Sequence, residues 1–110
     1  MPELREYVGP TGVSEFGRWF EVLDAFAAAK VSIALARLGE GNTSKLKAIG
    51  GGVAELRIHY GPGYRVYVGA DGPELVILLR GGTKRNQPAD IRRARRDWLL
   101  YKAAKKQASK

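Results

Sequence analysis

Cysteine is absent from the 110 residues of this chain, and histidine occurs only once. The lack of cysteine excludes disulfides, thiolate nucleophiles and zinc–thiolate sites. One histidine, with carboxylates at no ligand spacing, offers no convincing zinc site, and hard metals usually need clustered Asp or Glu. The serines have no histidine partner in a recognisable context, which leaves covalent catalysis unsupported. We therefore expect a protein that uses no metal and no other cofactor.

Long hydrophobic runs are also missing. No apolar segment approaches the roughly 20 residues that cross a bilayer, and no charged and then apolar leader opens the chain. We expect a cytoplasmic protein without membrane association. The chain is long enough for one hydrophobic core and shows neither a linker nor a repeat. This predicts a single domain over residues 1–110.

Acidic residues are few, with 11 Asp and Glu against 19 Lys and Arg, and the formal net charge is +8. A surplus of this kind makes a polyanion the first partner to consider, because each phosphate that is neutralised releases counterions. Contact with nucleic acid or the ribosome is favoured over the alternative that basic tails only aid solubility.

The clearest structural pattern runs from Glu55 to Gln87. Apolar and polar residues alternate over residues 55–60, and the same alternation resumes over residues 64–68. Glycine and proline at residues 61–63 predict a three-residue hairpin loop between two strands whose faces stay in phase.

The loop, if centred on Pro62, fixes which polar side chains are neighbours. Arg57 then lies opposite Tyr67 across the hairpin. His59 lies opposite Arg65, so that four polar side chains share one patch.

A third strand is predicted over Glu74–Arg80, after a two-residue turn at Asp71-Gly72. This strand is apolar on both faces, as is typical of a central or covered strand. We expect the side chains on one face to enter the main core (Leu75, Ile77 and Leu79). Those on the other face are expected to lie beneath the polar patch (Val76 and Leu78). The chain then leaves the strand near Lys84, at the rim where Arg57 and Arg65 lie.

A short first strand is predicted at residues 3–8. Helical spacing predicts helices in the rest of the chain. Residues 15–38 predict two antiparallel helices after an N-cap at Ser14. Residues 43–54 are interpreted as a flexible connection and not as a phosphate loop, since the order GxxxxGK[ST] is absent. A last helix after Pro88 presents one apolar face to the sheet, formed by Ile91, Ala94, Trp98 and Tyr101. The predicted fold is α+β, a small antiparallel sheet packed against an N-terminal helical hairpin and a C-terminal helix.

The polar patch combines guanidinium and ammonium groups with one imidazole and a phenol. These groups can bind an RNA phosphate, stabilise the charge of a pentacoordinate transition state and move protons to and from oxygen. Such a set suits RNA cleavage in which the 2′-hydroxyl attacks the adjacent phosphate, a reaction that needs no cofactor.

A family resemblance is carried by the run ELRIHYGPGYRVY, by LVILLRGGTK after the next turn, and by Gln87 three residues on. The chain resembles the addiction-module killer proteins of the RelE/ParE toxin superfamily, close to the HigB-like branch, over nearly its whole length. The resemblance implies a RelE-like fold, cleavage of mRNA in the ribosomal A site, and silencing by a cognate antitoxin that is often a helix-turn-helix DNA-binding protein.

The resemblance also implies roles for single residues. Arg65 matches the arginine that contacts the scissile phosphate, Arg57 sits where the preceding strand usually supplies a basic group, and Lys84 matches the residue that stabilises the transition state. Family ribonucleases often place a tyrosine or histidine near the last helix as general acid, and between Lys84 and Trp98 this chain has neither. From the strand phase we hypothesise that His59 or Tyr67 replaces it. Further RNA contacts are expected from Lys45, Lys47, Arg80, Arg85, Arg92 and Arg95.

The function expected from these patterns is that of a type II toxin–antitoxin toxin acting as a ribosome-dependent mRNA endoribonuclease. Two alternatives stay open, because a shared fold does not decide function. One is a ParE-like toxin that inhibits gyrase without any chemistry, and the other is a non-enzymatic nucleic-acid-binding module. Arg57 and Arg65 also have a structural alternative, as surface ion pairs with Glu55 or Glu74 that contribute little.

Overall fold

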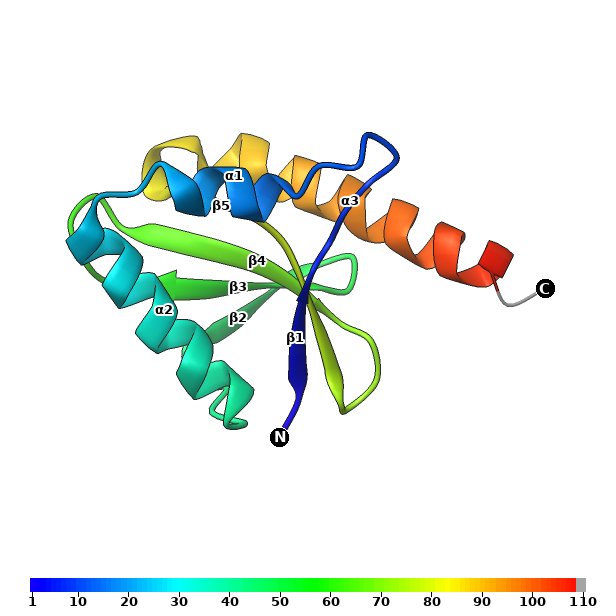
Figure 1. Cartoon of the computed structure of the whole chain (residues 1–110), viewed down its shortest axis with the longest axis horizontal. Coiled ribbons are helices and arrows are strands. Elements are labelled where there is room, and N and C mark those ends of the chain that lie inside the picture. Colours follow the sequence, from blue (N-terminus) through cyan, green and yellow to red (C-terminus); the bar gives the residue numbers. More distant parts are fainter. Residues whose placement is uncertain (109–110) are drawn as a thin grey trace.

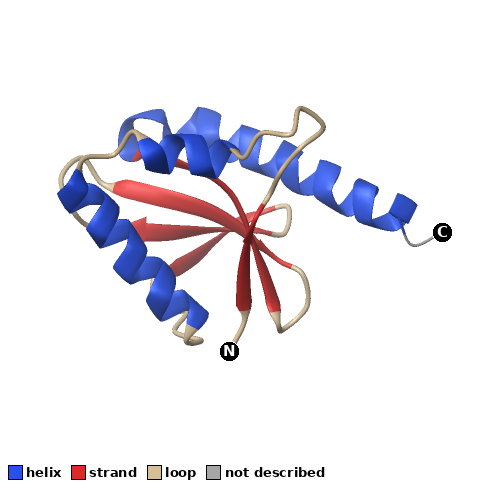
Figure 2. Ribbon diagram, in the orientation of Figure 1, coloured by secondary structure: helices blue, strands red, loops and turns tan. Residues whose placement is uncertain are grey.

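The computed structural model of the protein describes residues 1–108 and has an α+β fold, with one sheet, two N-terminal helices and a C-terminal helix (Figures 1 and 2). The strands are β1 (Glu3–Glu6), β2 (Leu46–Gly50), β3 (Val53–Ile58), β4 (Tyr64–Ala70) and β5 (Leu75–Thr83). The helices are α1 (Glu15–Glu21), α2 (Ala25–Gly39) and α3 (Gln87–Ala108), with a short 3-10 turn η1 (Lys84–Asn86) before α3.

The sheet is mixed, and its strand order is β1-β5-β4-β3-β2. β1 runs parallel to β5, whereas every other neighbouring pair is antiparallel. The prediction of a purely antiparallel sheet was therefore wrong, although the strand in residues 3–8 exists. Alternation marks a strand but does not give its direction or partner, so the sequence pattern could not place β1.

The hairpin of β3 and β4 has a five-residue loop, residues 59–63, in place of the three residues expected. Arg57 pairs with Arg65, and Glu55 pairs with Tyr67. His59 lies in the loop and not opposite Arg65, which corrects the predicted register. Because the register differs by two residues, each side chain still points to its predicted face.

The connection between β4 and β5 is also longer than predicted. A two-residue turn would pair Ala70 with Pro73, but Ala70 pairs with Val76 instead. This shift of three residues is odd and exchanges the two faces of β5. Val76 and Leu78 consequently enter the main core, whereas Ile77 and Leu79 face α3, the reverse of the prediction.

Residues 43–54 were wrongly interpreted as a flexible connection. They contain β2, which pairs with β3 as an edge strand. Gly50, Gly51 and Gly52 all have positive φ angles, of 91°, 67° and 82°, so this turn needs glycine for its backbone conformation. A Cβ on Gly52 would also lie 2.7 Å from Nε1 of Trp98, because α3 packs close to the turn.

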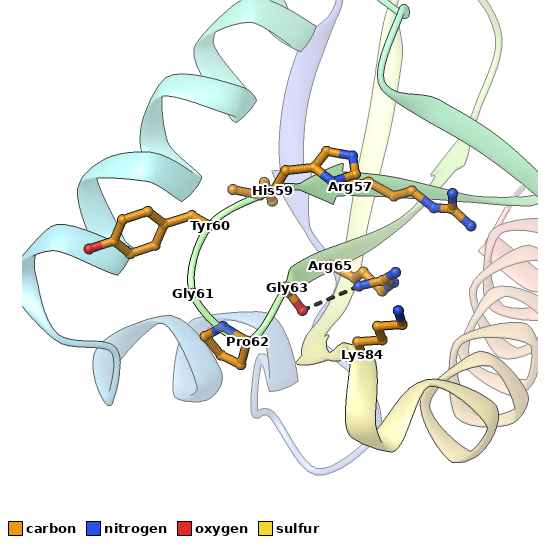
Figure 3. Close-up of a pocket in the computed structure, with 9 residues that line it drawn as sticks. Arg57, His59, Tyr60, Gly61, Pro62, Gly63, Arg65 and Lys84 are labelled. Atoms are coloured by element: carbon orange, nitrogen blue, oxygen red, sulfur yellow. Dashed lines mark hydrogen bonds between the residues drawn. The ribbon is translucent and has the colours of Figure 1, made fainter.

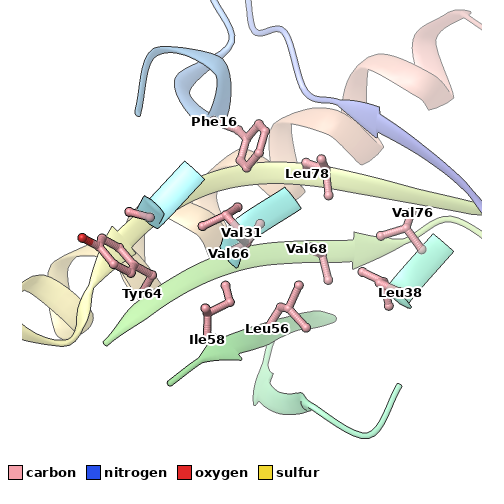
Figure 4. Packing of buried hydrophobic residues seen from close by; sticks show 11 residues of the cluster. Phe16, Val31, Leu38, Leu56, Ile58, Tyr64, Val66, Val68, Val76 and Leu78 are labelled. Carbon is pink, nitrogen blue, oxygen red and sulfur yellow. The ribbon is translucent and has the colours of Figure 1, made fainter. Parts of the chain in front are cut away.

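Helices cover both faces of the sheet. One face packs with α1 and α2 around a core that includes Phe16, Val31 and Val66 (Figure 4). On the other face α3 buries Ala94 and Trp98, as its predicted apolar face requires. Asp90 and Asp97 of α3 are buried as well.

The N-terminal region forms two helices, as predicted. Ser14 caps α1 by accepting from the Gly17 amide at 2.9 Å, and Asp24 caps α2 in the same way through the Ala27 amide. Figure 1 shows the two helices at an open angle, with α1 packed mainly on β5 and α2 mainly on β3. They do not form the predicted antiparallel hairpin, because each helix buries its apolar face against the sheet.

Candidate functional site

A depression of about 450 Å³ lies where the loop between β3 and β4 meets the beginning of η1 (Figure 3). We call it the loop pocket. It is lined by Arg57, Ile58, His59, Tyr60, Gly61, Pro62, Gly63, Arg65 and Lys84.

Three cationic side chains meet at the loop pocket from three different elements. Arg57 of β3 and Arg65 of β4 are a cross-strand pair, and the Lys84 amide donates to the Gly63 carbonyl at 2.9 Å, which ties η1 to the loop. Figure 3 shows the charged ends of all three side chains on the same side of the pocket. This placement agrees with the rim position that the sequence predicts for Lys84.

Gly63 allows this close assembly. Its φ of 79° lies in the left-handed region, and a Cβ there would come within 3.2 Å of Nη1 of Arg65 and 3.6 Å of Cβ of Lys84. The Gly63 carbonyl also accepts from Nη1 of Arg65 at 3.2 Å. One glycine therefore supplies the turn and accepts hydrogen bonds from the Arg65 guanidinium and the Lys84 backbone amide.

The carboxylate of Glu55 lies behind the cations and is fully buried. Its Oε1 accepts from Nε of Arg57 at 2.8 Å, and its Oε2 accepts from Nε2 of Gln87 at 2.7 Å. Nε of Arg65 lies 3.4 Å from Oε2. The sequence indicated Glu55 only as a surface ion-pair partner, and it indicated no contact between Gln87 and this carboxylate.

Burial on its own raises the pKa of the Glu55 carboxyl. The hydrogen bonds from Arg57 and Gln87, together with the charge of Arg65, outweigh this effect and hold the pKa below its usual value. Glu55 is therefore ionised at neutral pH. Its negative charge against the three positive charges of Arg57, Arg65 and Lys84 leaves the group with a net +2.

The two acid–base candidates occupy different environments. His59 is exposed and lines the loop pocket. Tyr67 is fully buried beneath α3, where its hydroxyl has no hydrogen-bond partner within residues 1–108. Burial raises the pKa of Tyr67, and the Glu55 and Asp90 carboxylates raise it further. Tyr67 does not line the pocket, so its position argues against the predicted role.

Comparison with known proteins finds no protein-family model that matches the chain. An uncharacterized protein of Haemophilus influenzae is 42% identical to it over 81 residues, which are 73% of this chain and 82% of the Haemophilus protein. This chain belongs to the same family as that protein. Because the relative is itself uncharacterized, membership of the family assigns no activity, and the functional argument rests on the site.

The remaining predicted RNA contacts of this family member lie outside the loop pocket. The exposed ones are Lys45, Lys47, Arg85, Arg92 and Arg95. Arg80 instead forms an ion pair of 2.9 Å with Asp97 of α3, and both side chains are largely buried. This partner inside the protein argues against the prediction that Arg80 contacts RNA. Arg95 donates to the Ile49 carbonyl of β2 and so holds α3 against the glycine turn.

A second groove adjoins the loop pocket and has a volume of about 310 Å³. It lies between α2, the loop that precedes β2, and β3. Four cationic side chains line it (Lys30, Arg37, Lys45 and Arg57), together with apolar ones that include Ile33 and Leu56. Arg57 and His59 line both depressions, so an occupant of the groove would also cover part of the loop pocket.

Metal-ligating clusters and membrane-spanning helices are both absent from the described part of the chain. Within residues 1–108 no cluster of three or more His, Cys, Asp or Glu side chains is arranged to hold a metal ion. Over the same residues, no helix has the length and apolar character needed to cross a membrane.

Proposed function

We propose that the protein is the toxin of a type II toxin–antitoxin module and cleaves mRNA on the ribosome by metal-independent attack of the 2′-hydroxyl. The observation that carries the proposal is the convergence of Arg57, Arg65 and Lys84 on one pocket that also exposes His59. The resemblance to the RelE/ParE superfamily supports it through the same residues.

Cleavage of this kind forms a bond between the 2′-oxygen and phosphorus and breaks the bond to the 5′-oxygen, which leaves a cyclic phosphate. A phosphodiester carries one negative charge, whereas the pentacoordinate transition state approaches two. A site with a net charge of +2 interacts more strongly with the transition state than with the substrate. Arg57, Arg65 and Lys84 come from three different elements and all line the pocket, so together they can contact the phosphoryl oxygens.

His59 is assigned to proton transfer. Its imidazole is the side chain of the pocket best suited to protonating the leaving 5′-oxygen, while the proton of the attacking hydroxyl goes to water. Such a group contributes about 10²–10⁴-fold to the rate. Tyr60 also lines the pocket, but its ring stacks on Tyr64, with 6.4 Å between centroids, and points away from the cations (Figure 3).

The kinds of partner that we propose are inferred from the charge of the protein. A net charge of +8 favours contact with mRNA and the ribosome. The cationic and apolar groove beside α2 suits an acidic, amphipathic segment of a cognate antitoxin, which would cover Arg57 and His59 together. We retain from the resemblance the proposal that the antitoxin is a helix-turn-helix DNA-binding protein.

The test is primer extension on a reporter mRNA after brief induction in cells. Lys84→Ala and His59→Ala are the informative variants, because both side chains are exposed and their loss leaves no buried partner unpaired. Arg5→Ala is a matched control on β1, where the exposed Arg5 side chain forms an ion pair of 2.8 Å with Glu3. We expect in-frame cleavage with the wild type and the control, and a large loss of cleavage with the other two.

The opposite outcome is equally defined. Growth arrest in all four strains with intact mRNA would reject the nuclease. A gyrase supercoiling assay would then test the ParE-like alternative, and RNA binding without a cleaved product would favour the non-enzymatic one.

A further inference from the structure

We propose that Glu55 is a positioning residue, whose buried carboxylate orients the Arg57 and Arg65 guanidinium groups so that both grip the same phosphoryl group. This inference rests on the proposed function of the loop pocket. It adds to that function a group that does not touch the substrate.

The contacts of Glu55 leave defined edges of both arginines free. Arg57 uses Nε for Glu55, and within residues 1–108 its two Nη atoms have no protein partner. Arg65 has Nε beside Glu55 and Nη1 on the Gly63 carbonyl, which leaves Nη2. The atoms that remain are those at the pocket end of each side chain, where a phosphate oxygen can accept from them.

Two arginines directly opposite each other on neighbouring strands repel and would otherwise splay apart. The carboxylate offsets this repulsion from behind. The exposed fraction of the side chain rises from 0% for Glu55 to 9% for Arg65 and 33% for Arg57. The network is therefore fixed at its buried end and open at the ligand end.

Gln87 connects the network to the rest of the fold. It is the first residue of α3, and its amide donates to the Oε2 atom that also faces Arg65. The direction of Arg65 thus depends on the docking of α3 as well as on the hairpin.

The substitution Glu55→Gln separates positioning from simple charge. It keeps the shape of the side chain but raises the net charge of the group from +2 to +3. Charge alone predicts tighter binding of an anion and cleavage that is at least as fast. Positioning predicts slower cleavage in spite of the added positive charge, since a misplacement of about 1 Å can lower a rate about 10²-fold.

The experiment compares Glu55→Gln with Asp97→Asn in the full chain. Both variants neutralise a buried carboxylate that pairs with an arginine on the α3 face, and Asp97 is outside the loop pocket. One measurement is single-turnover cleavage of mRNA on programmed ribosomes. The other is affinity for ribosomes whose A-site codon carries 2′-O-methyl groups, which block attack by the 2′-oxygen.

We expect Glu55→Gln to cleave about 100-fold more slowly with unchanged or tighter binding, and Asp97→Asn to match the wild type in both. Equal losses in the two variants would mean a general effect of destabilisation and would overturn the proposal. So would a Glu55→Gln variant that cleaves as fast as the wild type. Gln87→Ala retains the carboxylate charge and should give a smaller loss, which keeps the test valid if Glu55→Gln does not fold.

A second readout does not depend on cleavage. In ¹⁵N NMR spectra, the Nε–H signal of Arg57, which donates to Glu55, should be protected from exchange in the wild type, and the guanidinium signals of Arg57 and Arg65 should shift on addition of inorganic phosphate. Glu55→Gln should abolish the protection, and protection that persists would overturn the positioning role. Absence of cleavage in the wild type would instead reject the proposed function, so the two failures are distinguishable.

Discussion

Replacement of Gly81 by alanine should show that the core and the loop pocket are mechanically connected. Gly81 lies in β5 beneath Trp19 of α1, and an added Cβ would come within 2.0 Å of Cε3 and 2.3 Å of Cδ2 of the indole. Ordinary carbon contacts begin near 3.4 Å, so the ring would have to move by about 1.4 Å. Trp19 packs against Tyr64, which stacks on Tyr60 of the pocket, with centroids 6.2 and 6.4 Å apart.

The cost can be placed near the upper end of the range for overpacked cores, at about 3 kcal/mol in the free energy of unfolding. The indole also packs against Phe16, with 6.0 Å between ring centroids, so its movement disturbs this contact as well. Urea unfolding monitored by tryptophan fluorescence measures this loss. The cleavage rate should fall as well, because a displaced Trp19 moves Tyr64, and Tyr64 stacks on Tyr60 of the loop pocket.

The control is Gly39→Ala at the end of α2. The nearest atom to an added Cβ there is Cδ1 of Leu4, at 3.9 Å, and φ is not positive. This change should stabilise the fold by about 0.4–1 kcal/mol through the unfolded state. Trp19→Leu should relieve most of the cost of Gly81→Ala in the double variant. A Gly81→Ala variant as stable as the wild type would refute this reasoning, and so would simple additivity of the two changes.

Two further predictions concern the charges of the α3 region. Burial raises the pKa of Asp90, although Arg80 and Arg93 oppose the shift. The folded state therefore binds this proton more tightly, and the stability it contributes at low pH is lost as pH rises from 3.8 through the raised pKa. Asp90→Asn should flatten this decline in urea unfolding measured across pH, and an unchanged slope would refute it. Arg85→Gln with Arg92→Gln should reduce the dependence of log affinity for RNA on log salt by about 0.7 for each phosphate that is no longer neutralised, whereas an unchanged slope would remove these arginines from the RNA surface.

Where the predicted register was wrong by an even number of residues, the side chains still lay on their predicted faces of the sheet. The β3–β4 hairpin was misplaced by two residues, and Arg57 and Arg65 still fell on one face together. The turn after β4 was misplaced by three residues, and the two faces of β5 were exchanged. The signal Asp71-Gly72 was interpreted as a complete turn, but the chain uses four residues there, and β5 begins at Leu75.

The two edge strands of the sheet were the elements missed or given the wrong pairing. β2 ends in glycines whose positive φ angles serve a tight turn, and from the sequence alone these glycines were interpreted as a flexible segment. The parallel pairing of β1 with β5 depends on how the helices cross the sheet, which no local pattern contains.

The candidate site was also predicted only in part, because some of its contacts join residues far apart in the sequence. Short-range spacing brought together Arg57, Arg65 and Lys84, since they flank one hairpin loop and the strand beside it. The burial of Glu55 and Tyr67 depends on α3, which docks from a distant part of the sequence. The polar phase that Glu55 shares with Arg57 was the only available sign of its contact with the site.

The two outer strands of the sheet also bear on aggregation. An exposed strand offers unpaired N–H and C=O groups to any extended chain, and lysines, irregular pairing and short length are the common protections. β2 carries the exposed Lys47 and a break in register between Ala48 and Gly50. β1 is only four residues long. Both margins of the sheet therefore resist the addition of another strand, so that copies of this chain can accumulate without joining edge to edge.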